Sequence, residues 1–151
     1  MATFEPRDPE FEAKIRASFG QQTAMQTLGA VMGNVSPGQV EIEMPYRADL
    51  AQQHGFIHGG IVTAILDSAC GYAAFSLSAP GTAVLTVEYK VNFVAPAKGE
   101  RFVARGEVVR SGATIAVCKG DVFAYDNGEE KLVATMLTTM MLTPNRPNLA
   151  N

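Results

Sequence analysis

One segment in the middle of the chain constrains the fold more than any other: QQHGFIHGGIVTAILDSACGYAA, residues 52–74. It begins with polar residues and the pair Gly59-Gly60, and then stays apolar or small for about four helical turns. Prolines flank the segment at Pro45 and Pro80 and none lies inside it, so the pattern predicts one long helix that starts at the glycine pair. A helix that is this apolar has to be enclosed by the rest of the chain.

A helical projection separates this segment into two faces. One face is a core stripe formed by Val62, Ile65, Leu66, Ala69 and Ala73. The opposite face is small except for one carboxylate and carries Gly60, Thr63, Ala64, Asp67, Gly71 and Ala74. Small residues let another backbone or a flat ligand come close, and an ionised carboxylate there is costly to bury without a partner. Asp67 is therefore a candidate catalytic group, with a partly exposed or structurally bonded carboxylate as the alternative.

The start of the predicted helix offers a second feature. Gly59 and Gly60 lie where N–H groups have no partner within the helix and where the helix dipole is positive. A glycine there lets a substrate oxygen approach an N–H group that would polarise a carbonyl and hold the oxyanion formed on attack. His58 and Gln52 lie just upstream and could orient the same group. The alternative is that His58-Gly59-Gly60 only forms a tight entry turn.

The spacing of these two features decides how they can act together. Asp67 follows Gly59 by eight positions, so the two are roughly 12 Å apart along one helix. A general base has to lie about 3 Å from the atom or water that it activates. One copy of the helix cannot supply both groups to one carbonyl, whereas two antiparallel copies related by a twofold axis can. The spacing therefore predicts at least a dimer.

The motif of HGG followed by an aspartate nine residues after the histidine resembles the hotdog-fold thioesterases of the phenylacetate-degradation (PaaI-like) type. The segment LTVEYKVNFVAPAKGE, residues 85–100, is similar to the strand and Pro-Ala turn that follow the helix in that family. The resemblance covers about residues 12–142. It implies an α+β hotdog fold, in which an antiparallel sheet wraps around one long central helix, and hydrolysis of acyl-CoA thioesters at a dimer interface.

The resemblance also implies roles for single residues. Asp67 matches the carboxylate that acts as general base or nucleophile, and Gly59 matches the backbone amide that binds the thioester oxygen. Gln52 matches an Asn or Gln that places the thioester or the water, although a shift of one or two residues in the loop would move this role to Gln53 or His54. His58 is the remaining candidate among the catalytic residues.

The candidate substrate-binding residues are Thr86, Gly60, His54 and Phe56. Thr86 matches a Ser or Thr that assists water or substrate in some members of the family. The apolar residues Met25, Leu28, Phe56 and Phe75 suit an aromatic or a medium-chain acyl group, although core packing is the favoured role for Met25 and Leu28. Four basic residues are candidates to contact the CoA phosphates: Lys90, Lys98, Arg105 and Arg110. The alternative is that they are ordinary surface cations.

Composition excludes several other classes of protein. With 47% apolar and 18% charged residues among 151, the chain is expected to form one globular domain over residues 1–151. A net charge of −3 without a basic run argues against nucleic acid. No apolar run reaches the length of a membrane span and no signal peptide is recognised, so we expect a cytoplasmic protein. Cys70 and Cys118 lack metal-binding spacing, and neither a metal nor a cofactor is expected.

The remaining segments predict a helix, a turn, a hairpin and four later strands. The expected elements are a helix over residues 8–19 capped by Asp8, a turn over 21–28, a hairpin of 30–35 and 40–45, a polar loop over 46–57, strands over 82–94, 102–110, 114–125 and 132–142, and a frayed tail over 143–151. We expect the four later strands to form a meander, with Asp126-Asn127-Gly128 as the last hairpin turn.

The function that these observations favour is an acyl-CoA thioesterase that acts as a homodimer, or as a homotetramer built from it. Two other functions use the same fold. A hotdog dehydratase or hydratase would use His54 with Asp67 as an acid–base pair, but those relatives carry Pro-Gly after the histidine where this chain has Gly55-Phe56. A binding module would sense an acyl-CoA without cleaving it.

Overall fold

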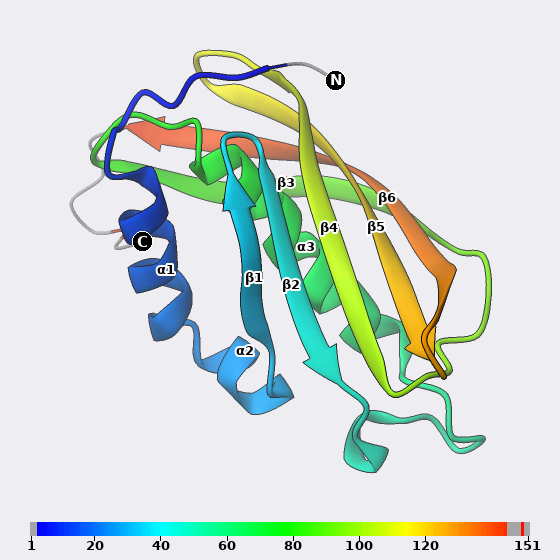
Figure 1. Ribbon diagram of the computed structural model, residues 1–151. Helices are drawn as coiled ribbons and strands as arrows, with labels where there is room; N and C mark the ends of the chain where they lie inside the picture. Colours follow the sequence, from blue (N-terminus) through cyan, green and yellow to red (C-terminus); the bar gives the residue numbers. More distant parts are fainter. Residues whose placement is uncertain (1–2, 145–148, 150–151) are drawn as a thin grey trace.

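The computed structural model describes residues 3–144 and residue 149. The helices within this part of the chain are α1 (Phe11–Gln21), α2 (Thr23–Leu28), the short 3-10 helix η1 (Ala48–Leu50) and α3 (Gly59–Phe75). The strands are β1 (Val31–Ser36), β2 (Gln39–Pro45), β3 (Thr82–Phe93), β4 (Arg101–Ser111), β5 (Ile115–Asp126) and β6 (Glu129–Pro144). Figure 1 shows the sheet curling around α3, with α1 and α2 beside β1. The expected α+β hotdog fold is confirmed.

The sheet is antiparallel throughout, and its strand order is β1-β2-β4-β5-β6-β3. The expected meander is therefore wrong at one connection, because β3 pairs with β6 instead of with β4. Turn residues indicate where the chain reverses, but they do not decide which strand becomes its neighbour. Strand β4 instead packs directly on the helix: Gly106 lies so close to the backbone of Ala69 that a Cβ there would overlap it.

The core lies between α3 and the concave face of the sheet. All five residues of the predicted stripe on α3 are at most 1% exposed: Val62, Ile65, Leu66, Ala69 and Ala73. Phe102, Ile42 and Met44 face them from the sheet and are fully buried. This stripe fixes the rotation of α3 about its axis, and with it the direction in which Asp67 points.

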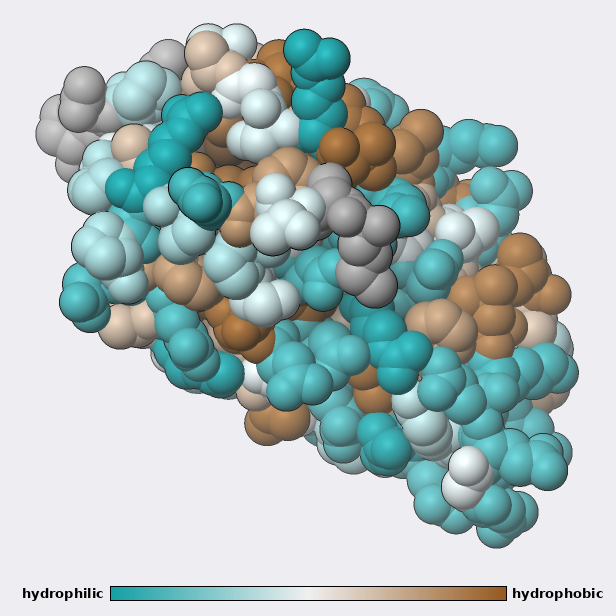
Figure 2. Space-filling model, turned by 45° about the horizontal axis from the view of Figure 1, so that its top comes forward, coloured by the Kyte–Doolittle hydropathy of each residue, from teal (hydrophilic) through white to brown (hydrophobic). Residues whose placement is uncertain are grey.

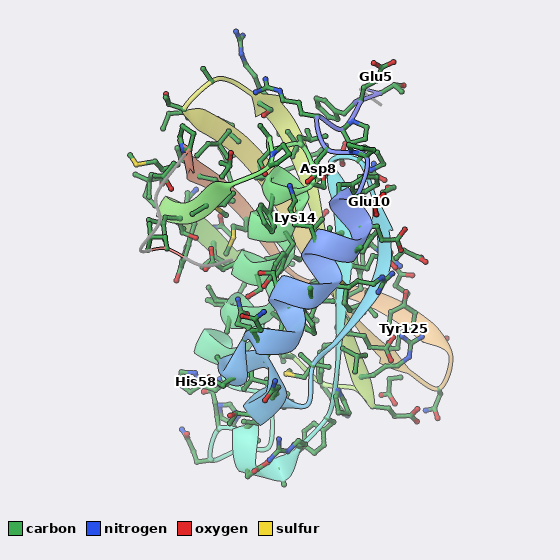
Figure 3. All side chains as sticks on the ribbon, turned by 90° about the vertical axis from the view of Figure 1, so that its left-hand side faces the viewer. Glu5, Asp8, Glu10, Lys14, His58 and Tyr125 are labelled. Carbon is green, nitrogen blue, oxygen red and sulfur yellow. The ribbon has the colours of Figure 1, made fainter. Side chains whose placement is uncertain are left out.

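The N-terminal segment differs from the expectation in two ways. Asp8 accepts a hydrogen bond from the Glu10 amide at 2.9 Å and pairs with Lys14 at 3.3 Å, so it stabilises the turn before α1, which begins at Phe11 (Figure 3). Residues 21–28 contain the helix α2 instead of a turn, ended by a left-handed Gly29 with φ 69°. Met25 and Leu28 on α2 belong to the buried core, which is the role that the sequence favoured.

Both predicted hairpins are present. Asn127 and Gly128 have φ values of 51° and 79°, as the turn between β5 and β6 requires. The expected polar loop over 46–57 also contains η1. Strand β6 runs to Pro144, so the first two residues of the expected frayed tail are strand; residues 145–148, 150 and 151 lie outside the described residues. No helix among the described residues is long and apolar enough to cross a membrane.

Strand β3 forms one edge of the sheet and is unusually exposed. Its apolar side chains include Leu85, Val87, Tyr89 and Phe93, which are 44–54% exposed. Figure 2 shows hydrophobic residues gathered in separate patches between hydrophilic ones on the face that it displays. A long edge strand with apolar side chains is a ready template for pairing with another strand.

Candidate active site

Asp67 lies in the middle of α3 and faces β3. The hydroxyl of Thr86 on β3 donates a hydrogen bond to Oδ1 of Asp67 at 2.9 Å. Burial raises the pKa of the Asp67 carboxyl above its usual value, and the hydrogen bond from Thr86 partly offsets this rise. The structure thus brings together two residues that sequence analysis selected separately, and it leaves Oδ2 of the carboxylate for a further partner.

Asp67 opens into a cavity of about 360 Å³ between α3, β3 and the N-terminal helices. Its lining consists of Ser18, Gln21, Gln22, Asp67, Ser68, Gly71, Tyr72, Phe75, Val84, Thr86 and Met140. Gly71 follows Asp67 by one helical turn, and an added Cβ there would meet only the end of Met140 at 4.0 Å. The small-residue face of α3 therefore leaves room for a ligand beside the carboxylate.

The start of α3 is built around His58, which is its N-cap residue. The amide of Gly60 donates to Nδ1 of His58 at 2.9 Å, so this N–H group already has a partner. Because Nδ1 accepts, the ring proton of a neutral His58 lies on Nε2. The amide of Gly59 makes no hydrogen bond within the described part of the chain. Of the two glycines, Gly59 is therefore the one that offers its N–H group to a ligand.

A second cavity, of about 650 Å³, lies at this end of the helix. Its polar lining includes Gln52, His54 and His58, whereas Gln53 does not line it. Phe56 also lines it and packs against His54, with ring centroids 4.9 Å apart. The ring of Phe93 lies against Gly59, 3.1 Å from the position that a Cβ would take.

The two cavities share no lining residue. Asp67 and Thr86 line the first cavity, and Gly59 lines the second together with the loop residues before the helix. One protomer therefore keeps the carboxylate and the helix N-terminal amide apart, which agrees with their spacing in the sequence.

Tyr72 and Gln22 are among the polar residues of the Asp67 cavity that the sequence did not reveal. Tyr72 shares α3 with Asp67, and its position five residues later placed it on neither predicted face. Gln22 comes from the junction of α1 and α2, and its side chain reaches Tyr72 and Ser68. No periodicity in the sequence links residues about fifty positions apart, so only the fold could reveal this pair.

The two cysteines are not candidate nucleophiles. Both are buried, and burial raises the pKa of Cys118 to about 12 and that of Cys70 well above its usual value. Among residues 3–144, no cluster of three His, Cys, Asp or Glu side chains is arranged to hold a metal ion.

Residues 54–131 match the model of the Thioesterase superfamily, which is just over half of the chain. The chain belongs to the thioesterase superfamily. This membership places it among the thioester hydrolases, and the matched residues contain the start of α3, Asp67 and Thr86. The PaaI-like resemblance found in the sequence is thereby confirmed at the level of the family.

Individual relatives of this thioesterase also carry esterase or thioesterase names. Acyl-coenzyme A thioesterase 13 of Homo sapiens is 27% identical over 80% of this chain and 85% of its own length. A provisionally named esterase of Saccharolobus solfataricus is 33% identical, but over 56% of this chain; the chain spans 59% of that protein's length.

Solved structures give the same fold. A thioesterase family protein from Silicibacter pomeroyi is 53% identical, with a TM-score of 0.88 over 89% of this chain and 98% of that one. The PaaI protein of the E. coli phenylacetic acid degradation operon is 20% identical, with a TM-score of 0.79 over 87% and 92% of the two chains. At this identity, the similarity to the PaaI protein supports only the fold.

The hydrogen bond between Thr86 and Asp67 leads to a prediction on pH dependence. This bond lowers the pKa of Asp67, so the substitution Thr86→Val should raise that pKa further. If the ionised carboxylate is the active form, hydrolysis is lost as pH falls through this pKa, and the acid limb of the kcat/KM profile should move to higher pH. Thr86→Ser keeps the hydroxyl and should leave the limb near its wild-type position. An unchanged limb in Thr86→Val would remove Thr86 from this role.

Proposed function

We propose that the protein hydrolyses acyl-CoA thioesters as a homodimer in which each active site combines Asp67 of one protomer with Gly59 of the other. The observation that carries this proposal is the separation of a half-buried carboxylate and an unpartnered helix N-terminal amide on one helix. Both groups suit attack on a thioester carbonyl, and neither can complete the site within its own protomer.

Strand β3 supports the way in which two copies would meet. Its residue Phe93 contacts Gly59 and its residue Thr86 contacts Asp67, so the strand links both halves of the proposed site. Antiparallel pairing of two β3 edges about a twofold axis near Tyr89 would bring the Phe93 end of one protomer to the Thr86 end of the other. The same pairing would satisfy the backbone groups along the free edge of β3 and extend the sheet across the dimer.

The proposed chemistry uses the helix amide for the carbonyl and the carboxylate for the attack. The N–H group of Gly59 holds the thioester oxygen and then the oxyanion that forms on it. Ionised Asp67 either takes a proton from the water that attacks the carbonyl carbon, or attacks that carbon itself to give a mixed anhydride that water then cleaves. Collapse of the tetrahedral intermediate breaks the C–S bond and expels the thiolate of CoA, which takes up a proton. Gln52 and His58 line the same cavity as Gly59 and would orient the same carbonyl.

The cavity at the start of α3 suits the CoA arm of the substrate. It is lined mainly by apolar side chains, and a neighbouring cavity contains Phe56, Pro96, Lys98 and Lys131. Lys98 is therefore the preferred partner for a CoA phosphate among the earlier candidates. Arg105 is not, because it pairs with Glu41 and Glu130 on the face of the sheet turned away from α3.

Thiol release tests this function directly. Phenylacetyl-, hydroxybenzoyl- and straight-chain acyl-CoAs are incubated with the wild-type protein, and free CoA is followed with a thiol-reactive dye. We expect release from at least one aromatic or medium-chain substrate. Tight binding of the same acyl-CoAs without release would contradict hydrolysis and would support the binding module. Hydration of an enoyl-CoA without thiol release would support the dehydratase that uses His54 with Asp67.

A further inference from the structure

Part of the lining of the Asp67 cavity is a hydrogen-bonded set of polar side chains. The hydroxyl of Tyr72 lies 3.2 Å from Oγ of Ser18, and Nε2 of Gln22 donates to it at 3.4 Å. The hydroxyl of Ser68 donates to Oε1 of Gln22 at 3.0 Å. Two helices and the junction between α1 and α2 thus contribute to one polar wall, although the ring of Tyr72 itself is packed against Phe19 and Phe75.

This polar wall matters for the choice of acyl group. The side chains of Tyr72, Gln22 and Ser18 bond to one another but have further donor and acceptor capacity, and a hydrocarbon chain placed against them would leave that capacity without a partner, which is unfavourable. The apolar part of the lining is formed by Phe75, Val84 and Met140, beside the small Gly71. The cavity therefore suits an acyl chain that is mainly apolar and carries a polar group able to meet this wall.

The charges in the cavity restrict the polar group further. None of its lining residues is Lys, Arg or His, and Asp67 supplies a negative charge when ionised. A second carboxylate on the acyl chain would find no cation there and would be repelled. Burial raises the pKa of Tyr72, so its hydroxyl stays protonated at neutral pH and can donate a hydrogen bond. Its oxygen meanwhile accepts the N–H of Gln22.

We propose that Tyr72, supported by Gln22 and Ser18, recognises an uncharged hydroxyl or carbonyl group on the acyl chain of the substrate. This inference rests on the proposed function, since it takes the acyl group to occupy the Asp67 cavity. Tyr72 follows Asp67 by five residues, roughly 7.5 Å along the helix axis, so the recognised group is remote from the thioester. Tyr72 is a specificity-determining residue in this proposal, and it takes no part in the attack on the carbonyl.

Matched pairs of substrates test the inference. The value of kcat/KM is measured for ω-hydroxyhexanoyl- against hexanoyl-CoA, for para-hydroxyphenylacetyl- against phenylacetyl-CoA, and for adipoyl-CoA as the charged chain. We expect the wild type to prefer the hydroxylated member of at least one pair by about tenfold, the effect of one hydrogen bond, and to disfavour adipoyl-CoA. The first pair reports a group on a flexible chain and the second a group on a ring.

Two variants separate recognition from general damage. Tyr72→Phe keeps the ring and should abolish the preference, chiefly by weakening hydrolysis of the hydroxylated substrate. Tyr125→Phe is the matched control, because its hydroxyl bonds to Arg105 and Glu130 and lines neither cavity (Figure 3); its preference should equal that of the wild type. Equal hydrolysis within both pairs, or a preference that survives Tyr72→Phe, would overturn the inference.

A binding measurement keeps the inference testable if no substrate is hydrolysed. Calorimetry gives the affinity of the same acyl-CoA pairs for Asp67→Asn, with and without Tyr72→Phe. Tighter binding of the hydroxylated member that is lost with Tyr72→Phe would support recognition even though hydrolysis had failed. Equal affinities would overturn it. The two assays therefore distinguish failure of the inference from failure of the proposed function.

Discussion

Replacing Asp67 by asparagine should lower the turnover of the best acyl-CoA substrate by at least ~10²-fold. The asparagine side chain has nearly the same shape and can still accept the hydrogen bond from Thr86, but it can neither take a proton from water nor attack the carbonyl. The measurement is kcat from the release of free CoA. Asp121→Asn is the matched control, since Asp121 on β5 lines neither of the two cavities and its loss should leave kcat unchanged.

Thermal unfolding of Asp67→Asn shows whether such a loss is a catalytic effect. The folded-state pKa of Asp67 is raised, so the stability that comes from its protonated form is present at low pH and is lost as pH rises through that pKa. At neutral pH the ionised carboxylate therefore destabilises the fold, and Asp67→Asn should unfold at the same or a higher temperature than the wild type. A variant that kept its melting temperature and also its turnover would show that Asp67 is not the reactive group.

Replacing Gly59 by proline should lower turnover by about 10²–10³-fold, as expected when one donor to an oxyanion is removed. Gly59 is the first residue of α3 after the N-cap His58, and proline is well tolerated at this position because its N–H group has no partner within the helix. His58 has φ −59° and ψ 135°, a conformation that a following proline favours. The substitution thus removes the N–H group and preserves the helix.

Gly59→Ala provides the matched control for this variant. Its Cβ would meet the exposed ring of Phe93 as the proline ring would, but it keeps the N–H group. The account predicts that kcat falls far more in Gly59→Pro than in Gly59→Ala. Equal losses in the two variants would mean that contact with Phe93, and not the amide, is responsible.

The central helix could be predicted from the sequence because its apolar period and its flanking residues are local features. Its start at Gly59 and its buried stripe agree with the structure. The separation of Asp67 and Gly59 could also be predicted from the sequence, since the rise of a helix fixes the distance along its axis between any two of its residues.

The neighbours of that helix could not be predicted in the same way. The pairing of β3 with β6 depends on packing across the sheet, which turn residues do not encode. The polar wall formed by Tyr72 and Gln22 depends on where α1 and α2 fold against α3. Residue Thr86 was found only through the family resemblance, and its contact with Asp67 follows from the placement of β3 beside the helix.

A mixed dimer tests most directly the claim that each active site is shared between protomers. Asp67→Asn and Gly59→Pro chains are produced together with different affinity tags, and dimers that carry both tags are isolated. Each mixed dimer has one site with an intact Gly59 and an intact Asp67, and one site that lacks both. The account predicts about half of the wild-type turnover per dimer, although either variant alone is nearly inactive. Turnover no higher than that of the two parent variants would contradict it, because both groups would then act within one chain.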